Sequence, residues 1–165
     1  MASTEVITAP LIQDSIVSAI QNVCRTMMGK EVTLRPEVTE NSPLPTFELI
    51  ANVGFTGEAN GVVYLCMDDD FARFTTGRIL GMSPGEVSMH GAEVVNDAMG
   101  ELTNMSAGGF KNQLCDLGFP CKLTLPTIVR GKELRLVALK GSVRHIFTFD
   151  CAGQSLLVDI QLKSG

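Results

Sequence analysis

The chain has 165 residues, of which 45% are hydrophobic and 19% are charged, and its net charge is −5 at neutral pH. This length and composition are ordinary for a globular protein, so we expect a single domain over residues 1–165 with a buried core. Because the charge is negative and the thirteen Lys and Arg residues are scattered, a nucleic-acid partner is disfavoured.

The first ten residues have neither the basic start nor the apolar stretch of a signal peptide. No apolar run approaches the roughly 20 residues that span a bilayer, so no membrane partner is expected. The cysteines are odd in number and form no C-x-x-C motif, and the two histidines lack zinc-ligand spacing. We therefore expect free, buried thiols in a reducing compartment, and a cytoplasmic protein.

The first half of the chain predicts a helix, a short strand and a hairpin. Apolar residues at three- and four-residue spacing follow Pro10, and Gly29 ends this amphipathic helix. The alternating stretch from 30 onward is a short strand that stops at Pro36. Residues 46–55 alternate and pair across T-G-E-A-N-G with residues 61–67. One face of the first hairpin strand is expected to carry Phe47, Leu49, Ala51, Val53 and Phe55.

Three adjacent carboxylates, Asp68, Asp69 and Asp70, come directly after this hairpin. They could hold a metal ion, but no further ligand is placed nearby. The favoured interpretation is that they cap the helix of residues 68–81 and complement its dipole.

The second half begins with a turn and helix start at residues 83–86. A long helix is predicted over residues 88–116, ending at Gly118, and a strand then stops at Pro126. Residues 127–141 are expected to be extended with a turn at Gly131 and Lys132. A second hairpin follows over residues 142–163.

The two halves share the order helix, short strand ending in proline, and hairpin. This order predicts an internal repeat of residues 10–67 and 88–162. The expected fold class is α/β (α+β), a pseudo-symmetric domain with an antiparallel-rich sheet and two long helices packed on it.

The long helix has two faces when it is placed on a helical wheel. A core-facing set comprises Val95, Ala98, Met99, Leu102, Ser106 and Gly109. The opposite set comprises Glu93, Asp97, Glu101, Asn104, Gly108 and Lys111. Such a polar stripe is often only the solvated face of an amphipathic helix.

Three features favour a functional interpretation of the stripe instead. Asn104 is a poorer helix former than Gln or Lys. Gly100 and Gly108 border the stripe, where the pattern predicts nothing to bury, and they would let another protein's backbone come close. Gly109 is expected instead to admit close packing against the sheet.

At these residues the chain resembles the CheC/CheX family of bacterial chemotaxis phosphatases. The match is to a helical pattern of an acidic residue or Ser, then Glu, then Asn, represented here by Asp97, Glu101 and Asn104. Pro126 also belongs to the family's pattern. The helix–strand–Pro–hairpin order extends the resemblance over most of the chain.

The resemblance implies hydrolysis of the aspartyl phosphate on a CheY-type response regulator. Asn104 would orient the attacking water, and Glu101 would pair with the lysine of the receiver domain. Asp97, Gly100, Gly108 and Lys111 would support the helix or the partner contact. The chain would need no cofactor of its own, since Mg²⁺ would be the receiver's. No arginine sits beside the motif in the sequence.

The first helix departs from the two-site members of the family. Where a second site would lie it has Asp14, Ser18 and Gln21, without a Glu-Asn pair. The resemblance therefore implies one site per chain, as in the CheX branch, whose members are homodimers with a shared sheet. Residues 127–141 are a candidate for an exchanged strand.

Two other functions stay open from the sequence. The chain could bind a phosphorylated receiver, or join a flagellar-switch-like assembly, without catalysis. It could also be a metal enzyme built on Asp68–Asp70. Neither His90 nor His145 lies in a motif with a nucleophile, so a catalytic triad has little support.

Overall fold

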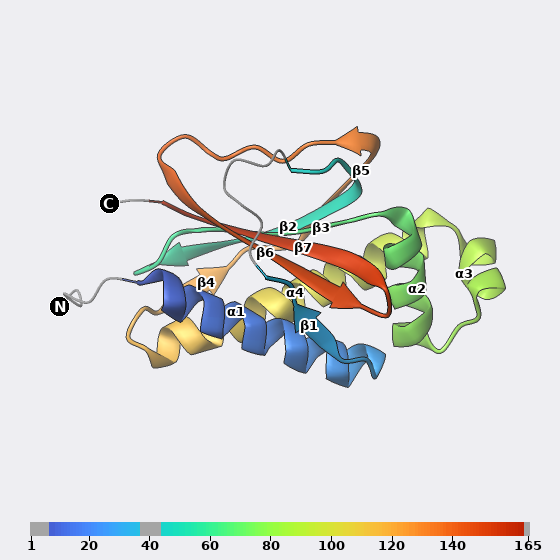
Figure 1. Ribbon diagram of the computed structural model, residues 1–165, viewed down its shortest axis with the longest axis horizontal. Helices are drawn as coiled ribbons and strands as arrows, with labels where there is room; N and C mark the ends of the chain where they lie inside the picture. Colours follow the sequence, from blue (N-terminus) through green and yellow to red (C-terminus); the bar gives the residue numbers. More distant parts are fainter. Residues whose placement is uncertain (1–6, 37–43, 164–165) are drawn as a thin grey trace.

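A computed structural model describes residues 7–36 and 44–163, and Figure 1 shows their arrangement. Two long helices lie beneath a twisted sheet, and two shorter helices stand at one end of it. The helices are α1 (Ala9–Val23), the π-helical turn η1 (Cys24–Met28), α2 (Asp69–Leu80), α3 (Pro84–His90) and α4 (Ala92–Asp116). The strands are β1 (Val32–Leu34), β2 (Phe47–Gly57), β3 (Gly61–Met67), β4 (Cys121–Leu123), β5 (Thr127–Leu134), β6 (Ser142–Cys151) and β7 (Gln154–Lys163). The predicted fold class, an antiparallel sheet with two long helices packed on it, is confirmed.

The strands pair in the order β1-β6-β7-β3-β2-β4, all antiparallel, and β5 pairs with β2. Both predicted hairpins are present, as β2–β3 and β6–β7. This order is symmetric. If β1 changes places with β4, β2 with β6 and β3 with β7, the list of strands is the same when it is read from its other end. An internal duplication would produce such an order, and the repeat of residues 10–67 and 88–162 stays a prediction.

The first helix begins and ends where the sequence indicates. The hydroxyl of Thr8 accepts a hydrogen bond from the backbone N–H of Leu11, and Pro10 occupies the first turn. At the other end Gly29 has a φ of 66°, a left-handed conformation that glycine adopts without strain. The last turn is π-helical, and its Met28 carbonyl accepts a hydrogen bond of 2.9 Å from Arg78 of α2.

The main core lies between the sheet and the helices. Leu49, Ala51, Val53 and Phe55 of β2 are buried in it, as predicted. Phe47, expected on the same face, packs instead in a smaller cluster with Ile50 and Cys66. The pairing of β2 with β5 shifts register between Phe47 and Leu49, and such an irregularity reverses the face on which the side chain lies.

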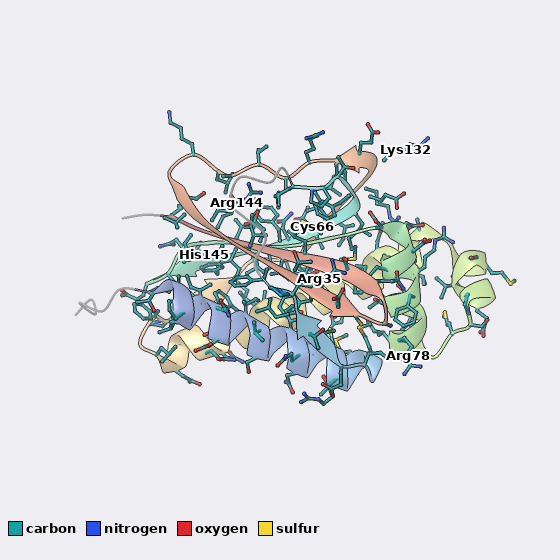
Figure 2. All side chains as sticks on the ribbon, in the orientation of Figure 1. Arg35, Cys66, Arg78, Lys132, Arg144 and His145 are labelled. Atoms are coloured by element: carbon teal, nitrogen blue, oxygen red, sulfur yellow. The ribbon has the colours of Figure 1, made fainter. Side chains whose placement is uncertain are left out.

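A buried polar network occupies the sheet face opposite the helices. Asp159, which has no exposed surface, accepts hydrogen bonds from Arg144 Nε at 2.6 Å and from Gln161 Nε2 at 3.2 Å. Arg144 also donates to the carbonyl of Leu136, and Gln161 accepts from the backbone N–H of Leu139. Figure 2 shows Arg144 between the sheet and the segment of residues 135–141. The network therefore holds this segment against the sheet. Burial raises the pKa of Asp159, although Arg144 acts to lower it.

The predicted helix over residues 88–116 is two helices. Ser83 and Glu86 form a capping box that starts α3, and α3 ends at Gly91, whose φ is 77° and ψ −168°. These angles break the helix before α4 begins at Ala92. The capping signal at 83–86 was visible in the sequence, but it belongs to a short helix of its own.

Residues 127–141 differ from the prediction in one respect. The expected turn at Gly131 and Lys132 is wrong, because β5 continues through both residues to Leu134. The strand pairs with β2 of its own chain from Thr127 to Leu134. It uses the edge of β2 that faces away from β3, since Asn52 pairs with Thr127 on one side and with Tyr64 on the other.

All five cysteines are free, and all except the partly exposed Cys115 are buried. Burial raises the pKa of the Cys24 and Cys66 thiols to about 12, which makes them poor nucleophiles. Within residues 7–36 and 44–163, no helix combines the length and apolar character needed to span a bilayer.

Candidate active site

The predicted site residues lie along the outer side of α4. Asp97 and Glu101 are exposed, and Asn104, about one turn beyond Glu101, is partly buried. The opposite side of the helix is buried against the sheet through side chains such as Met99, Leu102 and Phe110. Phe110 also packs edge-on against Phe55 of β2, with ring centroids 5.9 Å apart. Core packing therefore orients the polar stripe toward the outside of the molecule.

A shallow hollow of about 340 Å³ brings most of these residues together. One wall is α4, and the other is the chain at the start of β5. Its lining comprises Asn96, Asp97, Gly100, Glu101, Asn104, Pro126 and Ile128. Pro126, noted in the sequence only as part of the family pattern, is thus opposite the Glu-Asn pair.

The three glycines of α4 have three different environments. Gly108 is partly exposed, and a Cβ added there would meet no atom within 4 Å. Gly100 is buried, so its expected place on an open surface is wrong. A Cβ on Gly100 would lie 3.8 Å from Cγ of Pro126, an ordinary contact. Neither glycine is therefore required by packing within the described chain.

Gly109 is the glycine that packing does require, but against a helix and not against the sheet. A Cβ added at Gly109 would lie 3.1 Å from Cβ of Ala19 on α1. The helices are also joined by a 3.3 Å hydrogen bond from Gln113 Nε2 to the carbonyl of Ser15. The predicted reason for Gly109, close packing, is correct, and the predicted partner is wrong.

A larger groove of about 910 Å³ follows the boundary between α1 and α4. Gly108 and Met105 line this groove, and Asn104 lines both the groove and the smaller hollow. Lys111 lines neither. Burial raises the pKa of the Cys121 thiol in β4, and the charge of Lys111 acts to lower it. The structure therefore groups Asp97, Gly100, Glu101 and Asn104 around the smaller hollow, joins Gly108 to Asn104 in the groove, and leaves Lys111 outside both.

Glu101 and Asn104 are free to meet a partner. Among the described residues neither side chain makes a hydrogen bond or an ion pair. An ionised glutamate is an acceptor only, whereas an asparagine amide offers both donors and an acceptor. The pair can therefore contact a cationic group and a water molecule at the same time.

The counterpart face of α1 carries different chemistry. Asp14 and Ser18 are exposed, and Gln21 is partly buried and donates to the carbonyl of Val32 at 3.4 Å. Its amide is thus engaged with β1 of the same chain. This face has no Glu-Asn pair, and the amide that corresponds to Asn104 is engaged within the chain.

The three aspartates at 68–70 start α2 as predicted, but the capping differs from the prediction. Asp68 occupies the cap position without a capping hydrogen bond, and Glu48 of β2 accepts from the backbone N–H of Asp69 at 3.1 Å. The Asp69 carboxylate accepts from Arg73 and Arg130 instead. Across the described residues, no group of three or more Cys, His, Asp or Glu side chains is placed to hold a metal ion.

Two residues near the hollow were missed in the sequence. Asn96 lies beside Asp97 on α4 and accepts a hydrogen bond from Arg130 of β5. The two residues are 34 positions apart in the sequence, and no motif joins them. Only the pairing of β5 with β2 brings an arginine beside the site.

The fold resembles that of solved CheC-like proteins. A CheC-like protein from Shewanella sp. PV-4 superposes with a TM-score of 0.81, covering 93% of this chain and 97% of that one at 23% identity. The CheX–CheY–BeF3–Mg²⁺ complex from Borrelia burgdorferi matches with a TM-score of 0.72, covering 93% and 98% at 21% identity.

Sequence comparison identifies the family within this fold. The family model described as chemotaxis phosphatase CheX matches residues 49–150, more than half of the chain, and the chain belongs to this family. It is also 26% identical over 127 residues to the CheY-P phosphatase CheX of Thermotoga maritima, covering 76% of this chain and 79% of that protein.

Proposed function

We propose that this chain hydrolyses the aspartyl phosphate of a phosphorylated CheY-type response regulator, with Glu101 and Asn104 as its catalytic pair. The observation that carries the proposal is the placement of both side chains over one hollow, with no hydrogen-bond partner in the part of the chain that the structure describes. Family membership supports the reaction class, and the Thermotoga maritima relative is named as a CheY-P phosphatase.

The reaction needs little covalent help from the phosphatase. A water oxygen bonds to phosphorus while the bond from phosphorus to the receiver's aspartate oxygen breaks. The aspartate leaves as a carboxylate, and both protons of the water end on the phosphate product. Catalysis then consists of placing the water in line, which is a gain in orientation.

Asn104 performs this placement. Its amide oxygen accepts one hydrogen bond from the water and so directs a lone pair of the water toward phosphorus. Glu101, about one turn earlier, pairs with the receiver's lysine through a charge-assisted hydrogen bond that sets the docking register. Asp97 lies one further turn back, where it contributes to the rim of the contact. The chain supplies no metal, and Mg²⁺ stays with the receiver.

The glycines give the receiver room. Gly100 lies at the base of the hollow, and Gly108 leaves a bare patch one turn beyond Asn104. An interior glycine costs a helix about 1 kcal/mol relative to alanine, and packing does not account for it at these two positions. A partner surface that approaches α4 closely accounts for Gly108, and a partner group that enters the hollow accounts for Gly100.

The test is the rate of dephosphorylation of a phosphorylated receiver with and without this chain. Asn104→Ala should remove the acceleration while binding to the receiver persists. Asn112→Ala is the matched control, because Asn112 is an exposed asparagine two turns further along α4. Glu101→Ala should weaken binding, with Glu58→Ala as its control from the β2–β3 turn. An unaltered chain that binds receivers without accelerating hydrolysis would instead identify a non-catalytic binding domain.

We also propose that the chain forms a homodimer. β5 pairs with β2 along one edge, and large apolar side chains are exposed on β5, on the chain just before and after it, and at the start of β6. These are Leu125, Val129, Val137, Leu139 and Val143. We infer that they belong to the surface through which two copies associate. Sedimentation should show a dimer that Val137→Asp combined with Val129→Asp weakens, and a monomeric unaltered chain would refute the proposal.

A further inference from the structure

Arg130 of β5 joins three elements at one end of the hollow. Its Nε donates to Oδ1 of Asn96 on α4 at 2.5 Å, and its Nη1 donates to Oδ1 of Asp69 on α2 at 3.1 Å. The other oxygen of Asp69 accepts from Arg73 of α2 at 2.7 Å. One guanidinium thus holds β5 to α4 and to the start of α2.

These contacts connect the two walls of the hollow. Asn96 lies in the α4 wall, together with Glu101 and Asn104, whereas Pro126 and Ile128 form the opposite wall. Arg130 is only two residues beyond Ile128 on β5. Its bond to Asn96 therefore crosses from one wall to the other.

Arg130 meets α4 at Asn96, away from the Asn104 end of the hollow. Asn96 and Asn104 are eight positions apart, which at 1.5 Å per residue is about 12 Å along the α4 axis. An effect of Arg130 on the reaction must therefore pass through the position of the wall.

Both Asp69 and Arg130 are charged at neutral pH. Burial acts to raise the pKa of Asp69, but hydrogen bonds from Arg130 and Arg73 outweigh it and hold the pKa below its ordinary value. Asp69 is ionised, and the guanidinium of Arg130 is always charged. Its Nη1 donates to Asp69 while its Nε donates to Asn96. This forked geometry suits arginine and not lysine.

We propose that Arg130 is a positioning residue that fixes the width of the hollow between α4 and the Pro126–Ile128 wall. The inference rests on the proposed phosphatase function. With the contact in place, the receiver's phosphorylated loop seats at one depth, and the water on Asn104 is in line with phosphorus. Without it the wall shifts, the receiver still docks through Glu101, and alignment is lost. A misplacement of about 1 Å can cost on the order of 100-fold in rate.

The experiment measures kcat and KM for receiver dephosphorylation by Arg130→Gln. We expect kcat to fall about 10-fold or more while KM changes less than about 3-fold, because alignment is lost and docking is kept. Lys132→Gln is the matched control. It removes a positive charge from the same strand, and Lys132 is exposed and points away from the rest of the molecule in Figure 2. Its kcat should match that of the unaltered chain.

Variants of the partner residue separate positioning from a general structural role. Asn96→Ala should reproduce the fall in kcat, whereas Asn96→Asp should retain most activity, because a carboxylate still accepts from Arg130. Arg130→Gln combined with Asn96→Ala should be no worse than either single change, since both break the same contact. Melting curves should show all variants folded at the assay temperature.

Each outcome decides between the two hypotheses. If the unaltered chain does not accelerate dephosphorylation, the proposed function fails. If the unaltered chain is active but Arg130→Gln matches Lys132→Gln, or changes KM alone, the positioning role of Arg130 fails while the proposed function survives.

Discussion

The two long helices α1 and α4 pack side by side on the same sheet face, yet only one carries a candidate site. At the counterpart positions α1 has Ser18 and Gln21 where α4 has Glu101 and Asn104. Gln21 is hydrogen-bonded to β1, whereas Asn104 has no internal partner among the described residues. Two similar helices thus differ in whether the amide at this position is bonded within the chain or is left to meet a partner, and a few side chains decide which.

The largest expected effect on the dephosphorylation rate comes from removing Asn104 and placing the Glu-Asn pair on α1 instead. Asn104→Ala should reduce accelerated dephosphorylation about 100-fold, because the attacking water loses its orientation. Adding Ser18→Glu and Gln21→Asn to this variant should not restore the rate, since α1 has Val17 at the position that corresponds to Gly100. The measurement is the receiver dephosphorylation rate of the triple variant. Recovery to more than a tenth of the original rate would mean that the two side chains suffice.

A smaller effect is expected where the two helices touch. Gly109→Leu should lower the free energy of unfolding by about 1–3 kcal/mol, because its side chain meets Ala19 of α1. Gly108→Leu is the matched control, since a Cβ there meets nothing within 4 Å. Denaturant unfolding of both variants provides the comparison. Equal stability of the two would contradict the packing assigned to Gly109.

The next prediction separates stability from function at Gly108. Gly108→Ala should raise the free energy of unfolding by about 0.5–1 kcal/mol, because alanine is the better helix former and the site is open. The same change should weaken receiver binding if the bare patch admits the partner. Unfolding curves and binding titrations measure the two effects. A stabilised variant with unchanged affinity would show that Gly108 has no role in docking.

The smallest expected effect is the pH dependence of the Arg130 contact, which has no counterpart on α1 in the described chain. The pKa of Asp69 is lower in the folded state than its ordinary value of 3.8, so the unfolded state binds the proton more readily. The stabilisation is therefore present above about pH 4 and is lost as the pH falls through the lowered pKa. Both side chains are about 30% exposed, and the contribution should be below about 1 kcal/mol.

This acid dependence is measured as a difference between two proteins. Unfolding of the unaltered chain and of Arg130→Gln should differ at pH 6 and converge toward pH 2. A difference that stays constant over this range would show that Asp69 does not supply the linkage.

Local pattern was sufficient for most of the fold. The helix from Pro10 to Gly29, both hairpins and the short strands before Pro36 and Pro126 follow from periodicity and from glycine and proline signals. One error was local, because Gly91 breaks the helix predicted over residues 88–116, and two occurred where long-range pairing overrides local signals. Phe47 changed face because β2 shifts register against β5, and the expected Gly131–Lys132 turn is absent because β2 keeps that segment extended.

The sequence by itself determined that an outward-facing carboxylate and carboxamide lie one turn apart on α4, because helical periodicity alone places them on one side. Only the tertiary structure decided what surrounds them. Gly100 beneath Pro126, Gly109 against Ala19 and Arg130 bonded to Asn96 all join segments that are distant in the chain. Such contacts depend on how strands and helices pack, and no local pattern encodes the packing.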